Sequence, residues 1–195
     1  GAGADRTPPP HRRRLNAVRL AIGLLRWFPH GGLQRDALRT AEAARAAGHE
    51  VRIYARRWDG PRPEGVTVRL LDGGGRTNHR RVERFAAALR AELVRTPADA
   101  SIAFDRLPGV DAWFAADPCF AERLRRAPTP VHRMLPRART YLALEQALAG
   151  PEARTRVLLV DPRQREAFQR HHGTPAERLV DLPPGVAPDR RAGPD

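Results

Sequence analysis

The feature of this sequence that most constrains its fold is a repeated alternation of short apolar runs and longer segments of helical periodicity. Short apolar runs between turn residues predict β-strands, and apolar side chains three or four positions apart predict helices. This order predicts an α/β fold, with a mostly parallel Rossmann-like sheet and helices on both of its faces. We expect strands at residues 19–25, 51–55, 66–71, 100–104, 112–116, 156–160 and 179–182, and helices at residues 34–47, 82–94, 139–148 and 162–172.

The chain has the length and composition of a globular domain. It has 195 residues, of which 41% are hydrophobic and 29% are charged, which is enough to bury a core. Residues 1–16 stand apart, because Pro8-Pro9-Pro10 and Arg12-Arg13-Arg14 carry no apolar periodicity. They predict a disordered leader, with a nucleic-acid-binding arm as the alternative. We expect the folded domain at residues 17–185.

The chain is strongly basic. Its net charge of +13 comes from 35 basic residues, all of them arginine, against 22 acidic residues. Abundant Ala, Gly and Pro suggest that part of the arginine excess reflects a high-GC coding sequence. The remainder predicts attraction to an anionic partner, which could be nucleic acid, a phosphorylated sugar or an acidic membrane surface.

The sequence lacks the signatures of several common sites. The turn after the first predicted strand has no three-glycine dinucleotide fingerprint, and neither a Walker-type phosphate loop nor a G-x-S-x-G elbow occurs. The seven histidines and Cys119 show no metal-ligand spacing, and His171-His172 is typical of a polar helix end. A lone cysteine fits a reducing compartment, and no apolar run suits a membrane span or a secretory signal, so we expect a cytoplasmic protein.

Residues 28–36, with the sequence FPHGGLQRD, lie where the first predicted strand turns into the first predicted helix. Paired glycines allow a ligand to approach closely, and a helix N-terminus carries unpaired N–H groups that favour anions. The alternative is a tight loop in which Asp36 only favours the first helical turn. Ligands of parallel sheets bind beyond the carboxyl ends of the strands, where we expect this loop, Asp105-Arg106 and Asp117 to lie.

Six motifs stand in an order that resembles one enzyme family. They are FPHGGLQRD at residues 28–36, GHEVRIY at 48–54, TNH at 77–79, LPGVDAWFAAD at 107–117, GTPAER at 173–178 and LPPGVAPDR at 182–190. Together they are similar to the N-terminal half of the lipopolysaccharide core glucosyltransferase I family, within glycosyltransferase family 4. The resemblance extends over residues 19–191, nearly the whole chain.

The resemblance implies a GT-B fold, in which two Rossmann-like domains face each other and this chain supplies the N-terminal, acceptor-side half. It implies retaining transfer of glucose from UDP-glucose to a heptose of the lipopolysaccharide inner core, with no metal or other cofactor. Residues 186–195 would begin the linker to the donor-binding domain, so we expect the 195 residues alone not to turn over UDP-glucose. The alternatives are a family 4 enzyme with another sugar or acceptor, and a nucleic-acid-binding module, although no nucleic-acid motif occurs and no such partner is expected.

The resemblance also carries site residues over to this sequence. Gly31 and Gly32 resemble the loop that abuts the donor phosphates, and Asp36 matches an acidic residue at the reaction centre that orients the acceptor or stabilises positive charge. Arg190 matches the basic residue of a Pro-Asp-Arg motif on the donor side, with a solvated linker arginine as the alternative. Acceptor binding, or else turn and cap formation, is expected of Asn78, His79, Arg106 and Asp117.

Residues 122–141 hold six arginines against one acid, Glu122. A basic residue near an anionic leaflet contributes about 1 kcal/mol, so several suffice for reversible docking. Because the acceptor of the family is a membrane lipid, we expect this stretch to dock on anionic lipids at the cytoplasmic face of the inner membrane. The alternative is an arginine-rich solvated surface. The expected membrane contacts are Arg123, Arg125, Arg126, Arg133, Arg137 and Arg139.

Overall fold

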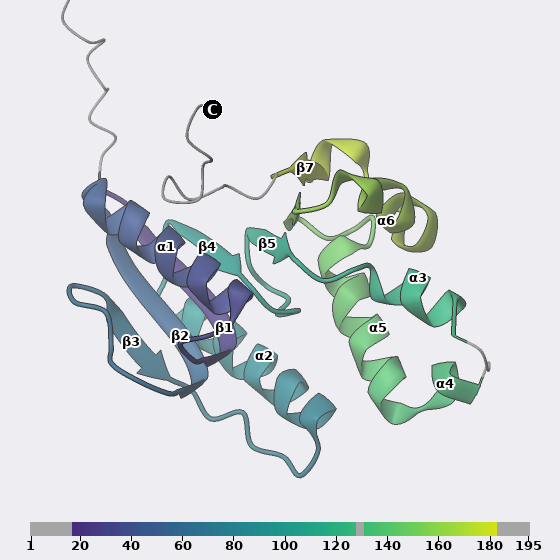
Figure 1. The fold of residues 1–195 in the computed structure, drawn as a ribbon, viewed down its shortest axis with the longest axis horizontal. Coiled ribbons are helices and arrows are strands. Elements are labelled where there is room, and N and C mark those ends of the chain that lie inside the picture. The colour runs from purple at the N-terminus through teal and green to yellow at the C-terminus, as the bar shows by residue number, and fades with distance from the viewer. Residues whose placement is uncertain (1–16, 128–130, 183–195) are drawn as a thin grey trace, which may run out of the picture.

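Seven parallel strands form one sheet in the order β3-β2-β1-β4-β5-β6-β7 (Figure 1). The computed structural model describes residues 17–127 and 131–182, and every pairing between neighbouring strands in it is parallel. The prediction of a parallel α/β sheet is therefore confirmed. The strands are β1 (Arg19–Trp27), β2 (Glu50–Trp58), β3 (Thr67–Leu70), β4 (Ala100–Ala103), β5 (Ala112–Ala115), β6 (Arg156–Leu159) and β7 (Leu179–Asp181).

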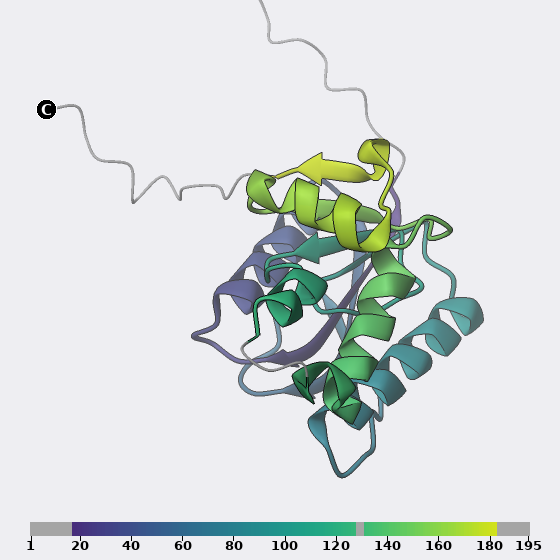
Figure 2. The same cartoon turned by 90° about the vertical axis from the view of Figure 1, so that its right-hand side faces the viewer.

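Helices cover both faces of the sheet, as the alternating pattern predicts. The helix α1 lies on one face, and α2, α5 and α6 pack on the other; Figure 2 shows α5 beside α2, with α3 and α4 next to α5. The helices are α1 (Gly32–Ala46), α2 (Asn78–Arg95), α3 (Phe120–Arg125), α4 (Val131–Met134), α5 (Pro136–Ala149) and α6 (Arg165–His172), with 3₁₀ turns η1 (Pro162–Gln164) and η2 (Ala176–Arg178).

Each face of the sheet has its own core. On the α1 face, Ala37 and Ala41 are buried against side chains such as Ile22, and their small size lets the helix approach the sheet closely. On the other face, Trp113 of β5 and Leu148 of α5 are buried together. Because the central strands are covered on both faces, they appear in the sequence as continuous apolar runs.

The expected strands and helices are all present, but several ends differ. The strand β2 continues to Trp58, whose ring stacks on Trp27 at the end of β1 with the centroids 4.6 Å apart. The helix α2 already begins at Asn78, α1 already begins at Gly32, and α5 begins at a proline that suits a first helical position. The helices α3 and α4 were not predicted, since four or six residues are too few to show a helical period.

The expected leader at residues 1–16 and the expected linker at 186–195 lie outside the described residues. The domain prediction therefore stays untested at both ends. Within the described ranges, no helix is long and apolar enough to cross a membrane.

Candidate functional site

The loops that follow β1, β4 and β5 meet at the carboxyl edge of the sheet. The chain passes from β1 to β2 and β3, and then returns to β4 on the other side of β1. Parallel sheets bind ligands at such a point, because the loops on its two sides diverge and leave a crevice. A pocket of about 170 Å³ and an adjoining one of about 60 Å³ lie here, and both are lined by Asp105, Arg106 and Asp117.

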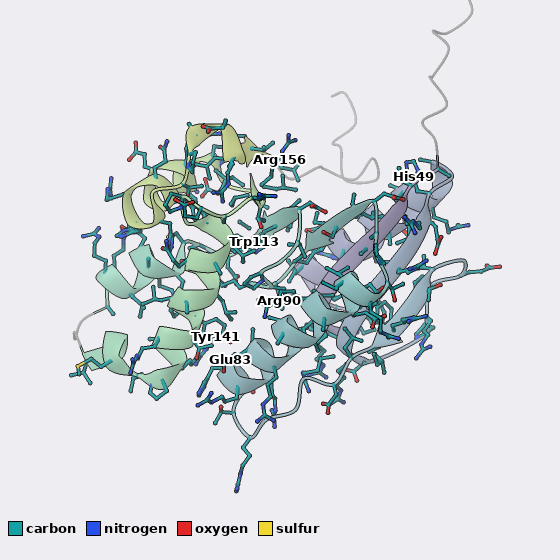
Figure 3. The ribbon with its side chains drawn as sticks, turned by 180° about the vertical axis from the view of Figure 1, so that it is seen from behind. His49, Glu83, Arg90, Trp113, Tyr141 and Arg156 are labelled. Atoms are coloured by element: carbon teal, nitrogen blue, oxygen red, sulfur yellow. The ribbon has the colours of Figure 1, made fainter. Side chains whose placement is uncertain are left out.

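We call the larger pocket the arginine pocket. It lies between the loops after β4 and β5 and the helices α2, α3 and α5. Figure 3 labels Tyr141 of α5, one of its lining residues, and, higher in the same view, Trp113 of β5, which is buried in the core. The smaller pocket reaches from the same loops to Leu33 at the start of α1. The polar and aromatic lining of the arginine pocket consists of Asp105, Arg106, Asp117, Phe120, Arg123, Arg137 and Tyr141.

The paired glycines have different surroundings. Gly31 is the N-cap of α1, and Gln34 folds back over it to donate from Nε2 to the carbonyl of Arg26 at 3.0 Å. A Cβ on Gly31 would lie 1.8 Å from Oε1 of Gln34, whereas a Cβ on Gly32 would point into open space. No side chain among the described residues caps α1, so its first N–H groups remain available to an anionic ligand.

Asp36 lies in α1, beyond the first helical turn. The alternative that it merely favours the first turn is wrong, because α1 begins at Gly32 and its first turn contains no acid. Its side chain is half-buried and does not line either pocket of the described structure. Its carboxylate accepts no hydrogen bond from the described residues; only its backbone carbonyl does, from Thr40. Its expected role at the reaction centre therefore stays a prediction.

Arg106 connects the pocket to the core. Its side chain is only 11% exposed, and its guanidinium donates to Asp117 at 3.1 Å, to the carbonyl of Pro118 at 3.0 Å and to Glu145 at 3.2 Å. The partner Asp117 is 75% exposed, so its carboxylate can also accept a ligand hydroxyl. Arg106 thus holds the loops after β4 and β5 together, which is a structural role, while the acceptor-binding role expected of it stays a prediction.

A buried polar cluster behind Arg106 was not found from the sequence. Glu145 of α5 accepts hydrogen bonds from the backbone N–H groups of Phe120 and Ala121 and faces Nε2 of His172 at 2.9 Å. It thereby caps α3, a contact across about 25 residues that no local pattern reveals. His172 is not simply a polar helix end, as the sequence suggested, because it is buried in this cluster.

Cys119, Glu145 and His172 each direct one possible metal-ligand atom into this cluster, within 4.8 Å of one another. Sequence spacing gave no sign of this grouping. The oxygens of Glu145 are already engaged by N–H donors and by Arg106, and burial together with Glu145 raises the pKa of the Cys119 thiol to about 12. Because the carboxylate of Glu145 is already occupied by these donors, the cluster fits a hydrogen-bond network better than a metal centre.

Asp105 is one of the three titratable residues that line both pockets, and it is the one whose pKa is shifted by burial. Its carboxylate accepts a hydrogen bond from the N–H of Leu25 at 2.6 Å, which joins the loop after β4 to β1. Burial raises the pKa of Asp105 to about 6, against the opposing effect of the Leu25 N–H. A carboxyl with this pKa changes its charge just below neutral pH and offers a hydrogen-bonding group to a ligand.

The remaining predicted residues are dispersed. Asn78 and His79 lie in the first turn of α2, where their side chains contact Arg81 and Thr77, while Val82 one turn later lines the arginine pocket.

Two of the expected membrane arginines, Arg125 and Arg126, pair with Glu122 of α3. Arg125 and His171 lower the pKa of the Glu122 carboxyl. Arg139 is exposed on α5. The side chain of Arg133, and Arg190 altogether, lie outside what the structure describes.

Comparison with known proteins identifies the family. The family model described as Glycosyltransferase Family 4 matches residues 30–190, most of the chain. The chain belongs to glycosyltransferase family 4. It is 37% identical over 172 residues to the lipopolysaccharide glucosyltransferase WaaG of Escherichia coli (strain K12), a match that covers 88% of this chain and 46% of that protein. This family 4 chain therefore spans about half the length of that relative.

Solved structures agree with this assignment. The crystal structure of WaaG, described as a glycosyltransferase involved in lipopolysaccharide biosynthesis, matches 88% of this chain and 46% of its own at 37% identity, with a TM-score of 0.84. This match confirms the fold expected for a half of a GT-B enzyme. A sucrose-phosphate synthase from Thermosynechococcus elongatus matches 86% of this chain and 48% of its own with a TM-score of 0.56, and at 16% identity it supports the fold alone.

The two glycines give a matched pair of substitutions. We expect Gly31→Ala to destabilise the chain by about 1 kcal/mol, because Gln34 must leave Gly31 and give up its hydrogen bond to Arg26. Gly32→Ala should leave the free energy of unfolding within about 0.5 kcal/mol of the original or raise it, since alanine favours helices. Urea denaturation measures both. Equal losses for the two variants would contradict the assigned role of Gln34.

The raised pKa of Asp105 predicts a pH-dependent stability. Between the ordinary value of 3.8 and about 6, the folded state binds more protons than the unfolded state, so stability falls as the pH rises. Asp105→Asn keeps an acceptor for Leu25 without the charge. We expect the variant to be more stable by about 1–2 kcal/mol at pH 7, after allowance for partial exposure, and equal to the original near pH 4. Parallel stability profiles from pH 4 to pH 7 would refute this.

Proposed function

We propose that this chain is the acceptor-side half of a retaining glucosyltransferase that transfers glucose from UDP-glucose to a heptose of the lipopolysaccharide inner core. The observation that carries the proposal is its likeness in sequence and structure to WaaG. The location of both pockets at the carboxyl edge, next to the start of α1, supports it physically.

The start of α1 is the proposed donor side of the site. Its uncapped N–H groups and positive dipole end suit the diphosphate of UDP-glucose, with Gly32 leaving room for close approach. Asp36 lies one turn further along the helix, where its carboxylate would orient the acceptor or stabilise the positive charge of an oxocarbenium-like transition state. Arg190 is proposed to act on the donor side, and the second half of the enzyme would hold most of the nucleotide. We propose that no metal is required.

The arginine pocket is the proposed acceptor side. Sugars present hydroxyl groups, and the carboxylates of Asp105 and Asp117 line the pocket where they can accept hydrogen bonds from them. Arg106 fixes Asp117 in place. Asn78 and His79 begin the helix that contributes Val82 to the pocket, so we propose that they contact a more distant part of the acceptor.

The location that we propose is the cytoplasmic face of the inner membrane. At the junction of α4 and α5, three apolar side chains are exposed: Val131 (62%), Met134 (76%) and Leu135 (46%). The end of α3 adds Arg125 and its C-cap Arg126, and α5 adds Arg139. An exposed apolar tip beside basic residues suits shallow insertion into an anionic leaflet, where a lipid acceptor would be presented.

The catalytic proposal is tested by completing the enzyme. The 195-residue chain alone should not transfer glucose from UDP-glucose to a heptose-terminated core acceptor, whereas its fusion to the C-terminal half of WaaG should. In that fusion, Asp36→Asn should lower kcat on the order of a hundredfold, because a charge at the reaction centre is lost. Chromatography of radiolabelled glucose on the acceptor measures transfer. A folded fusion that transfers nothing, or an unimpaired Asp36→Asn variant, would count against the proposal.

The membrane proposal has a matched control in exposed apolar residues of β3 and α2. Replacing Val131 and Met134 by serine should weaken co-sedimentation with phosphatidylglycerol vesicles about tenfold, because apolar insertion is lost. The same change at Leu70 and Val94, which are 51% and 78% exposed, should have no effect. Binding that is equal for both pairs, or equal on neutral and anionic vesicles at any salt concentration, would exclude docking through α4.

A further inference from the structure

Two guanidinium groups of the arginine pocket carry charge that the described residues do not neutralise. Arg123 and Arg137 form no ion pair within residues 17–127 and 131–182. The other arginines of this pocket and of the groove of about 470 Å³ beside it are all paired with acids. Those pairs are Arg106 with Asp117 and Glu145, Arg126 with Glu122, and Arg163 with Asp161.

Aromatic rings hold the two unpaired groups. The guanidinium carbon of Arg123 lies 4.8 Å from the ring centre of Phe120, and that of Arg137 lies 5.7 Å from the ring centre of Tyr141. The two rings are themselves in contact, with centroids 5.4 Å apart. Cation–π contact orients a guanidinium group without cancelling its charge or using its N–H donors.

The rings of Phe120 and Tyr141 are held in place by contacts on the core side of the pocket. Phe120 is 5% exposed, and its backbone N–H is bound to the carboxylate of Glu145 at 2.8 Å. Tyr141 belongs to α5, the helix that also supplies Glu145. Because both arginines pack on rings whose positions are set by α5 and its Glu145, little conformational freedom is lost when they bind a ligand.

The two acids that line the pocket have partners other than Arg123 and Arg137. Asp117 is bound to Arg106, and Asp105 is bound to the N–H of Leu25. Carboxylates that are already oriented accept hydroxyl groups, while free guanidinium groups donate to oxyanions in a forked geometry. A pocket with both kinds of group suits a sugar that carries an anionic substituent.

We propose that Arg123 and Arg137 bind a phosphate or carboxylate group on the acceptor glycan, so that the arginine pocket selects an acidic acceptor over a neutral one. This inference rests on the proposed function, since it specifies the acceptor of the same site. It also reassigns the two arginines, which the sequence placed among the membrane contacts, from the lipid surface to the bound glycan.

The test is a titration of the isotopically labelled 195-residue chain, followed by NMR of the backbone amides and the arginine Nε–H groups. Mannose 6-phosphate should cause saturable shifts at residues 120–123 and 137–141, including the Nε–H groups of Arg123 and Arg137, and unmodified mannose should not. Arg123→Gln and Arg137→Gln should each weaken binding about tenfold or more, as expected for a lost charge-assisted hydrogen bond. Arg84 is an exposed arginine of α2 outside the pocket, so Arg84→Gln is the matched control and should bind as the original chain does.

The outcomes separate this inference from its alternatives. Shifts that are absent, or equal for the control and the pocket variants, overturn it. If the two variants lose binding to phosphatidylglycerol vesicles but not to mannose 6-phosphate, the arginines contact lipid and the inference is wrong. The wild-type Nε–H shifts decide the matter even if a variant fails to fold. Since no step depends on glucose transfer, an inactive fusion enzyme would remove the proposed function and leave this measurement intact.

Discussion

The buried carboxylate of Glu145 is the group on which the rest of the site depends. Burial alone would raise the pKa of Glu145, but the hydrogen bond from His172 and the charge of Arg106 outweigh it and hold the pKa below its ordinary value. A buried charge that loses a partner is destabilising by about 3–5 kcal/mol, so its partners are held firmly. One side chain thereby fixes α3, α6 and the loops after β4 and β5 in relation to one another.

This arrangement divides the arginines of the site by task. Arg106 is nearly buried and serves as the link between Glu145 and Asp117, whereas Arg123 and Arg137 remain exposed on aromatic rings that the same network positions. An excess of arginine over the whole chain therefore says little by itself. The arginines that we assign to binding are the two that line a pocket and have no acidic partner among the described residues.

Much of the fold could be predicted from the sequence, because burial on both faces leaves a continuous apolar signature in strands such as β1 and β6. The turn at residues 28–36 and the common edge of Arg106 and Asp117 followed from the rule that such loops meet at the carboxyl ends. Glu145, His172 and the cap on α3 could not be predicted, since they become neighbours only in three dimensions. In a helix Arg126, four residues after Glu122, can pair with it, while Arg123, one residue after it, cannot. Because α3 is too short to be predicted, the sequence did not show that Arg123 has no acidic partner among the described residues.

We propose that the crevice beyond the carboxyl ends of β1 and β4 is the acceptor side of a glycosyl-transfer site. Its most direct test is to map a soluble, heptose-terminated inner-core oligosaccharide onto the labelled chain by amide shift perturbation. We expect saturable shifts at residues 105–106 of the loop after β4, at residues 117–123 of the loop after β5 and α3, and at the start of α5. Saturable shifts confined to another face of the sheet, or none at millimolar oligosaccharide, would contradict it.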